Sequence, residues 1–172
     1  MKRLLVVLLA VCMTFSLCAC TFAKDVADST LNIKAKAKTF EFDGISIELT
    51  TDFMRMDFIS EEYDFIVGTE TLTLMGIKMD NGETALGDMP VKDFAENFRS
   101  LMLDSNPTKI TLIDNIPTMQ YTASEDGEEQ TIAVMFYKAS DCFYVLCFGA
   151  DSEDFNEQYE DICKYAKTVK CE

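Results

Sequence analysis

Cysteine is the residue type in this chain whose side chain can take part in the most kinds of reaction. Four of the seven cysteines lie near its end: Cys142, Cys147, Cys163 and Cys171. An even number of cysteines in an exported chain is typical of disulfide bonding. The chemistry first to be considered is therefore thiol oxidation, and it depends on which cysteines the neighbouring elements bring together.

The elements around these cysteines suggest two pairings. Residues 142–149 are a nearly continuous apolar run that predicts a strand, and residues 152–169 predict a helix. The strand covers about 26 Å between residues 150 and 142. The helix, if it continues to residue 171, returns about 28 Å. We therefore hypothesise a disulfide between Cys142 and Cys171, and a second one between Cys147 and Cys163.

The same cysteines have other interpretations. Buried thiols serve as small apolar core residues. A thiol-redox or four-cysteine metal site would be favoured by a Cys-x-x-Cys motif, which the sequence lacks. We therefore expect no metal site and no cofactor, and the choice between bridges and free thiols stays open.

The residues that are missing exclude many enzyme classes. The chain has no histidine and no tryptophan. Without histidine there is no Ser-His or Cys-His nucleophile pair, and most zinc and copper sites are excluded. The 30 acidic residues leave a carboxylate-based hydrolase as the alternative enzyme. No pair of carboxylates stands out from the others, so we expect no catalytic residue.

Two acidic segments could hold a cation but fit turns better. Residues 80–88 (DNGETALGD) lack the order of an EF-hand, and Asn81-Gly82 favours a turn. Residues 124–130 (SEDGEEQ) predict a solvated hairpin tip. A third segment is apolar: Phe53, Met54, Met56 and Phe58 either close the core or form an adaptable binding groove.

The N-terminus has the layout of an export signal. Lys2 and Arg3 precede an apolar run over residues 4–17, which is shorter than the roughly 20 residues of a spanning helix. Residues 17–20 (LCAC) then resemble the bacterial lipobox. That resemblance implies cleavage before Cys20 and lipidation of its thiol, so that 1–19 is a signal peptide. Cleavage after Ala23, or an uncleaved anchor, are the alternatives.

Charge limits the partners of the mature chain. The net charge is −15, and removal of residues 1–19 changes it to −17 because two basic residues leave. Phosphate backbones and anionic lipid surfaces repel such a protein. We therefore expect no nucleic-acid partner, and contact with the membrane only through the lipid. Residues 20–38 are expected to carry that lipid and to serve as a tether.

Residues 39–172 predict a single α+β domain. Asp43-Gly44 between alternating apolar residues predicts a hairpin over 39–49. Further strands are expected at 63–67, 71–79 (with a bulge at Gly76), 109–113, 118–123, 131–137 and 142–149. Pro90 is expected to open one helix, and Ser152 to cap a second over 152–169.

This order of elements resembles the PsbP-like family, which includes a photosystem II subunit, a Ran-binding transport factor and bacterial lipoproteins. The residues that carry the resemblance are 40–49 (FEFDGISIEL), followed by Asp52 and Phe53. The resemblance implies an antiparallel sheet of about six to seven strands with helices packed on it, and binding or assembly rather than catalysis.

The functional expectation combines these points. We expect a non-enzymatic lipoprotein, anchored through Cys20 on the extracytoplasmic face of the cell membrane, that binds an envelope protein or a small ligand. A carboxylate-based hydrolase and a purely structural envelope protein are the alternatives.

Overall fold

The computed structural model describes residues 36–56, 63–80, 89–102, 105–125 and 127–172. Two antiparallel sheets make up most of this part of the chain. Seven strands are ordered β3-β4-β5-β9-β8-β7-β6, and three are ordered β1-β2-β10. The strands are β1 (Ala37–Phe42), β2 (Ile45–Thr50), β3 (Met54–Arg55), β4 (Phe65–Gly68), β5 (Thr73–Asp80), β6 (Thr111–Ile113), β7 (Ile116–Glu125), β8 (Glu128–Lys138), β9 (Cys142–Asp151) and β10 (Lys170–Cys171). The helices are α3 (Val91–Leu101) and α4 (Phe155–Ala166).

Strand β9 is the centre of the large sheet. It pairs with β5 on one side and β8 on the other, and every residue from Cys142 to Ala150 is buried. A strand without a polar face must be covered on both sides. The prediction of a central strand, made from its unbroken apolar run, is confirmed.

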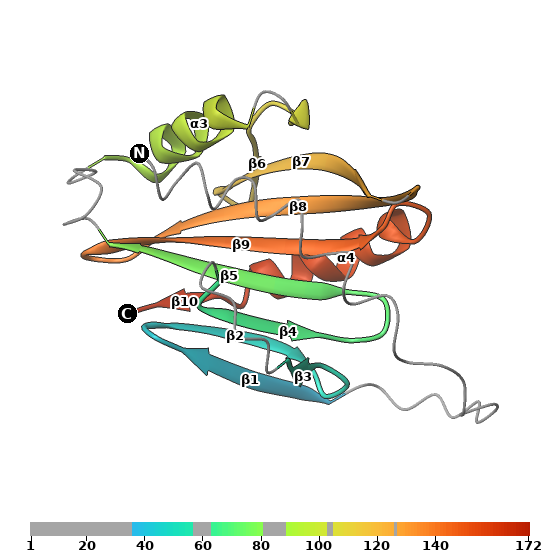
Figure 1. Cartoon of the computed structure of the whole chain (residues 1–172). Coiled ribbons are helices and arrows are strands. Elements are labelled where there is room, and N and C mark those ends of the chain that lie inside the picture. The colour runs from blue at the N-terminus through green and yellow to red at the C-terminus, as the bar shows by residue number, and fades with distance from the viewer. Residues whose placement is uncertain (1–35, 57–62, 81–88, 103–104, 126) are drawn as a thin grey trace.

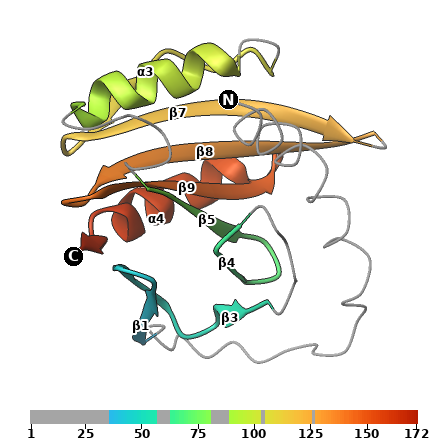
Figure 2. The same ribbon diagram turned by 60° about the vertical axis from the view of Figure 1, so that its left-hand side comes forward.

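Different elements cover the two faces of the large sheet. Helix α3 packs on one face, around Phe94 and Phe98. Helix α4 and the three-stranded sheet cover the other face (Figure 1). Figure 2 shows α3 beyond β7 and β8, with α4 and β1 on the far side of β9. The described residues therefore form three layers, with an apolar core on each side of the large sheet.

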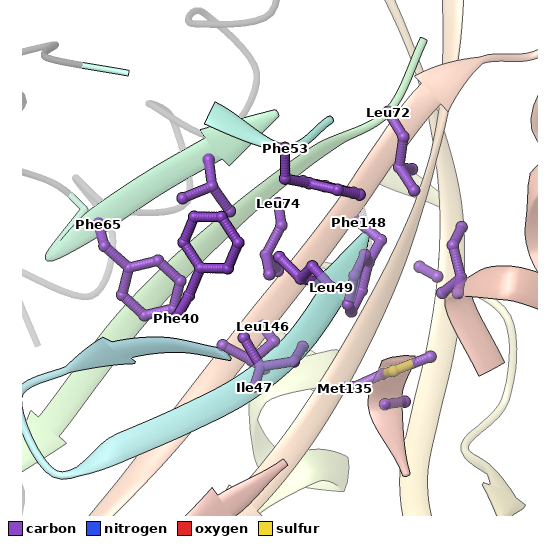
Figure 3. Packing of buried hydrophobic residues seen from close by; sticks show 14 of the residues in the cluster. Phe40, Ile47, Leu49, Phe53, Phe65, Leu72, Leu74, Met135, Leu146 and Phe148 are labelled. Atoms are coloured by element: carbon purple, nitrogen blue, oxygen red, sulfur yellow. The ribbon is translucent and has the colours of Figure 1, made fainter. Parts of the chain in front are cut away.

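The β1–β2 hairpin contributes much of the second core. Its turn is Asp43-Gly44, as predicted, and Gly44 has a φ of 76° that favours glycine. Strand β1 begins at Ala37, two residues before the expected start. Side chains of the hairpin face those of the large sheet (Figure 3). They are Phe40, Ile47 and Leu49 on one side, and Leu74, Leu146 and Phe148 on the other.

A stack of side chains joins the two sheets near one edge. The ring of Phe65 lies over Gly76, where an added Cβ would collide with it. The ring of Phe42 stacks on Phe65 at a centroid distance of 3.5 Å. The guanidinium of Arg55 lies 4.9 Å above Phe42 and donates a hydrogen bond to the carbonyl of Glu41 at 2.7 Å. Glycine at 76 therefore makes room for a ring.

The prediction of a bulge at Gly76 is wrong. Gly76 pairs in regular register with Phe65 on β4 and with Leu146 on β9. The alternation of apolar residues breaks there because the ring of a neighbouring strand fills the space of the missing side chain. Sequence alone cannot distinguish this close approach from a bulge.

The last helix is shorter than expected. Helix α4 begins at Phe155 after Asp154, and Ser152 lies in the preceding turn, where its hydroxyl is 2.9 Å from the Thr131 hydroxyl. The N-cap prediction is therefore wrong. The helix ends at Ala166, and residues 170–171 form strand β10 beside β2. Strand β3 was not predicted either. Strands β7 and β8 run longer than predicted, and their connection at 126–127 is correspondingly shorter.

The stack predicts the effect of a small substitution. Replacing Gly76 with alanine forces the Phe65 ring to move, so we expect the free energy of unfolding to fall by about 1–3 kcal/mol. Urea denaturation measures it. In a Phe65→Ala background the same substitution has no ring to displace, so its cost should nearly vanish. An equal cost in both backgrounds would show that Gly76 matters for another reason.

Candidate functional site

The residue with the clearest predicted role lies outside the described part of the chain. Cys20, the predicted signal over 1–19 and most of the predicted tether precede residue 36, where the description begins. Within the described ranges, no helix is long and apolar enough to cross a bilayer. Lipidation at Cys20 stays a prediction from the sequence.

The described cysteines fall on different sides of the large sheet. Cys142 begins β9 and faces the core shared with the three-stranded sheet, and Cys171 on β10 packs against that same core. Cys147 faces the opposite core, under α3. Cys163 belongs to α4, on the side of Cys142. All four are free thiols in this structure.

The hypothesised pairing of Cys147 with Cys163 is therefore wrong, because the large sheet separates them. The prediction rested only on how far along the strand and along the helix each of the two cysteines lies. In a strand, successive side chains point to opposite faces, so Cys147 and Cys142 (five residues apart) face opposite ways. Cys142 and Cys171 do meet the same core, although β10 rather than a longer helix places Cys171 there.

The tip of the β1–β2 hairpin is where polar side chains and thiols gather. The Tyr144 hydroxyl donates to the carbonyl of Asp43 at 2.6 Å. The ammonium of Lys78 is 2.7 Å from the Asp43 carboxylate. The amide of Glu172, next to Cys171, donates to the carbonyl of Gly44 at 2.9 Å. We call Asp43, Lys78, Cys142, Tyr144 and Cys171 the hairpin-tip cluster.

Glycine is required at this tip for two reasons. Its φ of 76° disfavours a side chain, and an added Cβ would lie 2.5 Å from the Tyr144 hydroxyl. Tyr144 stands on β9, so its hydroxyl reaches across the core from the large sheet to the small one. The close approach keeps the tip in register over the central strand.

Burial sets the protonation of the cluster. Burial raises the pKa of Cys142, and burial together with the charge of Cys142 raises that of Cys171 to about 11. The pKa of Tyr144 is raised by burial and by the neighbouring Cys142. The hydrogen bond to Asp43 raises the pKa of Lys78. At neutral pH the thiols and the phenol are therefore protonated and Lys78 is charged, so the cluster holds no activated nucleophile.

The Met/Phe segment divides between core and surface. Phe53 is buried in the core beneath the hairpin, whereas Met54 on edge strand β3 is 61% exposed. Met56 is partly buried, and Phe58 lies outside the described residues. The core interpretation is therefore confirmed for Phe53, whereas a binding role for this segment stays a prediction.

The acidic segments are described only in part. Asp80 ends β5, and residues 81–88 lie outside the described ranges. Glu125 and Glu128 flank the connection from β7 to β8 as the predicted hairpin tip requires. Among the residues that the structure covers, no group of three or more His, Cys, Asp or Glu could hold a metal ion.

Sequence reasoning missed the contacts of the hairpin tip. The Asp43-Gly44 turn was recognisable, but Tyr144 lies 101 residues away and Lys78 lies 35 residues away. No local pattern marks such pairs. The one available signal was the tyrosine itself, since a buried phenol usually needs a hydrogen-bond partner.

Cys147 makes stability depend on pH. An exposed thiol has a pKa near 9.0, and burial raises that of Cys147 to about 12. The stabilisation that comes with the raised pKa of the Cys147 thiol is therefore complete below about pH 9, and it is lost as the pH rises toward 12. Above pH 9 we expect the free energy of unfolding to fall more steeply than in a Cys147→Ala variant, by up to about 1.4 kcal/mol per pH unit. Urea denaturation at several pH values measures both slopes, and equal slopes would contradict the prediction.

Comparison with known proteins identifies the fold. No protein-family model matches the chain, and no curated protein matches it in sequence. A Bacteroides thetaiotaomicron structure matches with a TM-score of 0.54 and 11% identity, over 75% of this chain and 45% of that one. Cyanobacterial PsbP (CyanoP) from Synechocystis matches with a TM-score of 0.51 and 10% identity, over 86% and 98% of the two chains.

A mutant of Mog1 gives a similar result, with a TM-score of 0.51 and 10% identity over 79% of this chain and 96% of that one. The match spans less than half of the Bacteroides chain, but nearly the whole of CyanoP and Mog1. Similarity at this level of identity establishes a fold and no activity. The chain has a PsbP-like α+β fold, as the order of its elements predicted.

Proposed function

We propose that the protein is a lipoprotein, anchored through Cys20 on the extracytoplasmic face of the cell membrane, that binds a partner without catalysing a reaction. The observation that carries this proposal is the N-terminal sequence. A basic pair, an apolar run and residues 17–20 (LCAC) follow one another in the order that lipidated export signals have. Lipid chains then hold the protein by burying CH₂ groups, at about 0.8 kcal/mol each.

The charge of the domain supports this arrangement. The predicted mature chain carries −17, so anionic headgroups repel the domain while the lipid holds its N-terminus. The first described strand, β1, lies at an edge of the small sheet and pairs only with β2 there. A lipid anchor ahead of β1 would therefore join the domain at that edge of the small sheet.

The hairpin-tip cluster supports a binding role over a catalytic one. Its polar groups are engaged in contacts that hold the two sheets together: Tyr144 with the Asp43 carbonyl, and Lys78 with the Asp43 carboxylate. The protonated thiols add no nucleophile at neutral pH. With no histidine in the whole chain, an enzyme would have to rely on carboxylates alone.

Edge strand β3 is the surface that we propose for the partner. Met54 is exposed there, and Arg55 beside it is held in place by the ring of Phe42 and the carbonyl of Glu41. A flexible thioether adapts to varied apolar surfaces, and an arginine presents several donors in fixed geometry. This neighbourhood therefore suits a partner that presents an apolar surface with hydrogen-bond acceptors beside it.

Substitution of Cys20 tests the anchor. We expect Cys20→Ser to abolish incorporation of radiolabelled palmitate in cells. The variant should then appear either as protein released from washed membranes or as the precursor that keeps residues 1–19. Cys18→Ser is the matched control, because Cys18 leaves with the predicted signal and should not affect labelling. Palmitate label that persists in Cys20→Ser, or that disappears in Cys18→Ser, would contradict lipidation at Cys20.

Photo-crosslinking tests the partner surface. A photoreactive phenylalanine analogue at position 54 of the full-length protein should yield a discrete adduct in living cells. The matched control is position 112, because Leu112 is 55% exposed on β6 at the opposite edge of the large sheet. No adduct at 54, or adducts of the same size and yield at both positions, would contradict a specific surface at β3.

A further inference from the structure

The two thiols of the hairpin-tip cluster stand on elements that approach from opposite layers. Cys142 is the first residue of β9, at the centre of the large sheet, and it is 1% exposed. Cys171 is the penultimate residue, and on β10 it lies opposite Ile45 of β2. Figure 1 shows β10 at the same end of the molecule as the turn that leads from β8 into β9.

Two hydrogen bonds place the neighbours of both cysteines at one turn of the fold. Tyr144 stands two residues after Cys142 on the same face of β9, and its hydroxyl bonds to Asp43 at 2.6 Å. The amide of Glu172 bonds to Gly44 at 2.9 Å, which places the residue after Cys171 at the same turn. The strand that carries Cys142 and the strand that carries Cys171 therefore both contact residues 43–44.

Electrostatics supports the same placement. The charge of Cys142 contributes to the raised pKa of Cys171, and both thiols contribute to the raised pKa of Tyr144. Such effects in a folded protein come from neighbouring groups. No neighbouring charge contributes to the raised pKa of Cys147, since burial alone raises it.

We propose that Cys142 and Cys171 form an intramolecular disulfide in the exported protein, and that this bridge fastens the C-terminal strand β10 to the central strand β9. The inference rests on the proposed export, because disulfides persist in oxidising compartments. It assigns a structural role to two of the four described cysteines and leaves Cys147 and Cys163 as thiols.

The reaction is an exchange with the disulfide of an envelope thiol oxidase. The Cys171 thiolate attacks one sulfur of the oxidant disulfide, which breaks and releases one oxidant thiol. The Cys142 thiolate then attacks Cys171 in the mixed disulfide and releases the second oxidant thiol. The two protons of the cysteines pass through solvent to the oxidant sulfurs, and the two electrons reduce the oxidant to a dithiol.

Burial determines when this exchange occurs. In the folded protein Cys142 is inaccessible, and the raised pKa values leave few thiolates at neutral pH. The exchange therefore belongs to folding after export, before β10 settles beside β2. Once formed, the bridge closes a loop of about 30 residues and removes conformational freedom from the unfolded chain.

The bridge matters most for β10, which has few other attachments. This strand has two residues, and its pairing with β2 covers only Lys170 and Cys171. So short a ladder provides few hydrogen bonds to hold a strand in place. A bond to β9 joins this end to the most deeply buried strand of the fold.

Peptide mapping tests the bridge. Full-length protein is extracted from membranes in N-ethylmaleimide and digested with trypsin without reductant. Cleavage after lysines leaves Cys142, Cys147 and Cys163 in one peptide, 139–164, and Cys171 in the dipeptide 171–172. We expect these two peptides linked, with two maleimides on the larger one. Unlinked peptides carrying four maleimides in total from the membrane-extracted protein would overturn the proposal.

Matched variants identify the bonded partner. Cys142→Ala should abolish the link, whereas Cys147→Ala and Cys163→Ala should retain it. A link that survives in Cys142→Ala would overturn the pairing. We also expect Cys171→Ser to lower the Tm by about 10 °C, to the value of the reduced protein. An unchanged Tm on reduction of linked protein would show that the bridge does not fasten β10.

Failure of export is distinguishable from failure of the bridge. Cell fractionation of the same samples reports where the protein resides, and a cytoplasmic location would contradict the proposed anchor. The full chain is then refolded in a mixture of oxidised and reduced glutathione. A 139–164 link to 171–172 under those conditions supports the pairing, and four free thiols overturn it.

Discussion

The lack of any polar face on β9 is the constraint on which the rest of the structure depends. Its residues are buried from Cys142 to Ala150, so each face needs its own cover. Helix α3 covers one face through Phe94 and Phe98. The other face is too wide for α4 alone, and the three-stranded sheet fills the remaining area. The β1–β2 hairpin and strand β10 thus belong to the cover of one central strand.

That constraint also explains where the chemistry-bearing residues lie. The hairpin can cover the large sheet only if its tip is held in place, and Tyr144 reaches across the core to do so. Lys78 fixes the same turn from β5 through Asp43. Beside the same turn, Arg55 holds Phe42 over Phe65. Tyrosine, lysine and arginine, which serve as catalytic groups in many enzymes, here join two sheets.

Sequence patterns predicted the elements better than their meeting points. Alternation around Asp43-Gly44 and the apolar run at 142–149 are local, and both were recognised. The role of Gly76 depends on Phe65, a residue on another strand, so its sequence signal had two explanations. Strand β10 has two residues and pairs with β2, more than a hundred residues earlier, so no periodicity could reveal it. The candidate site consists of such long-range contacts, which is why its turn and its cysteines were predicted but the contacts of Tyr144 and Lys78 were not.

Strands β1 and β10 both pair with β2. The proposed anchor and the proposed bridge would therefore both act on the small sheet through neighbours of this one strand. Strand β2 pairs with β1 on one side and with β10 on the other. A load applied through the proposed lipid at Cys20 would enter the described part of the fold at β1 and would pull β1 away from β2 before it reached the large sheet. Phe40 in the core and Arg55 on Glu41 resist that peeling. A bond from Cys171 to Cys142 would keep β10 in place beside β2 while β1 moves. The small sheet would then remain fastened to β9 on the side away from the membrane anchor.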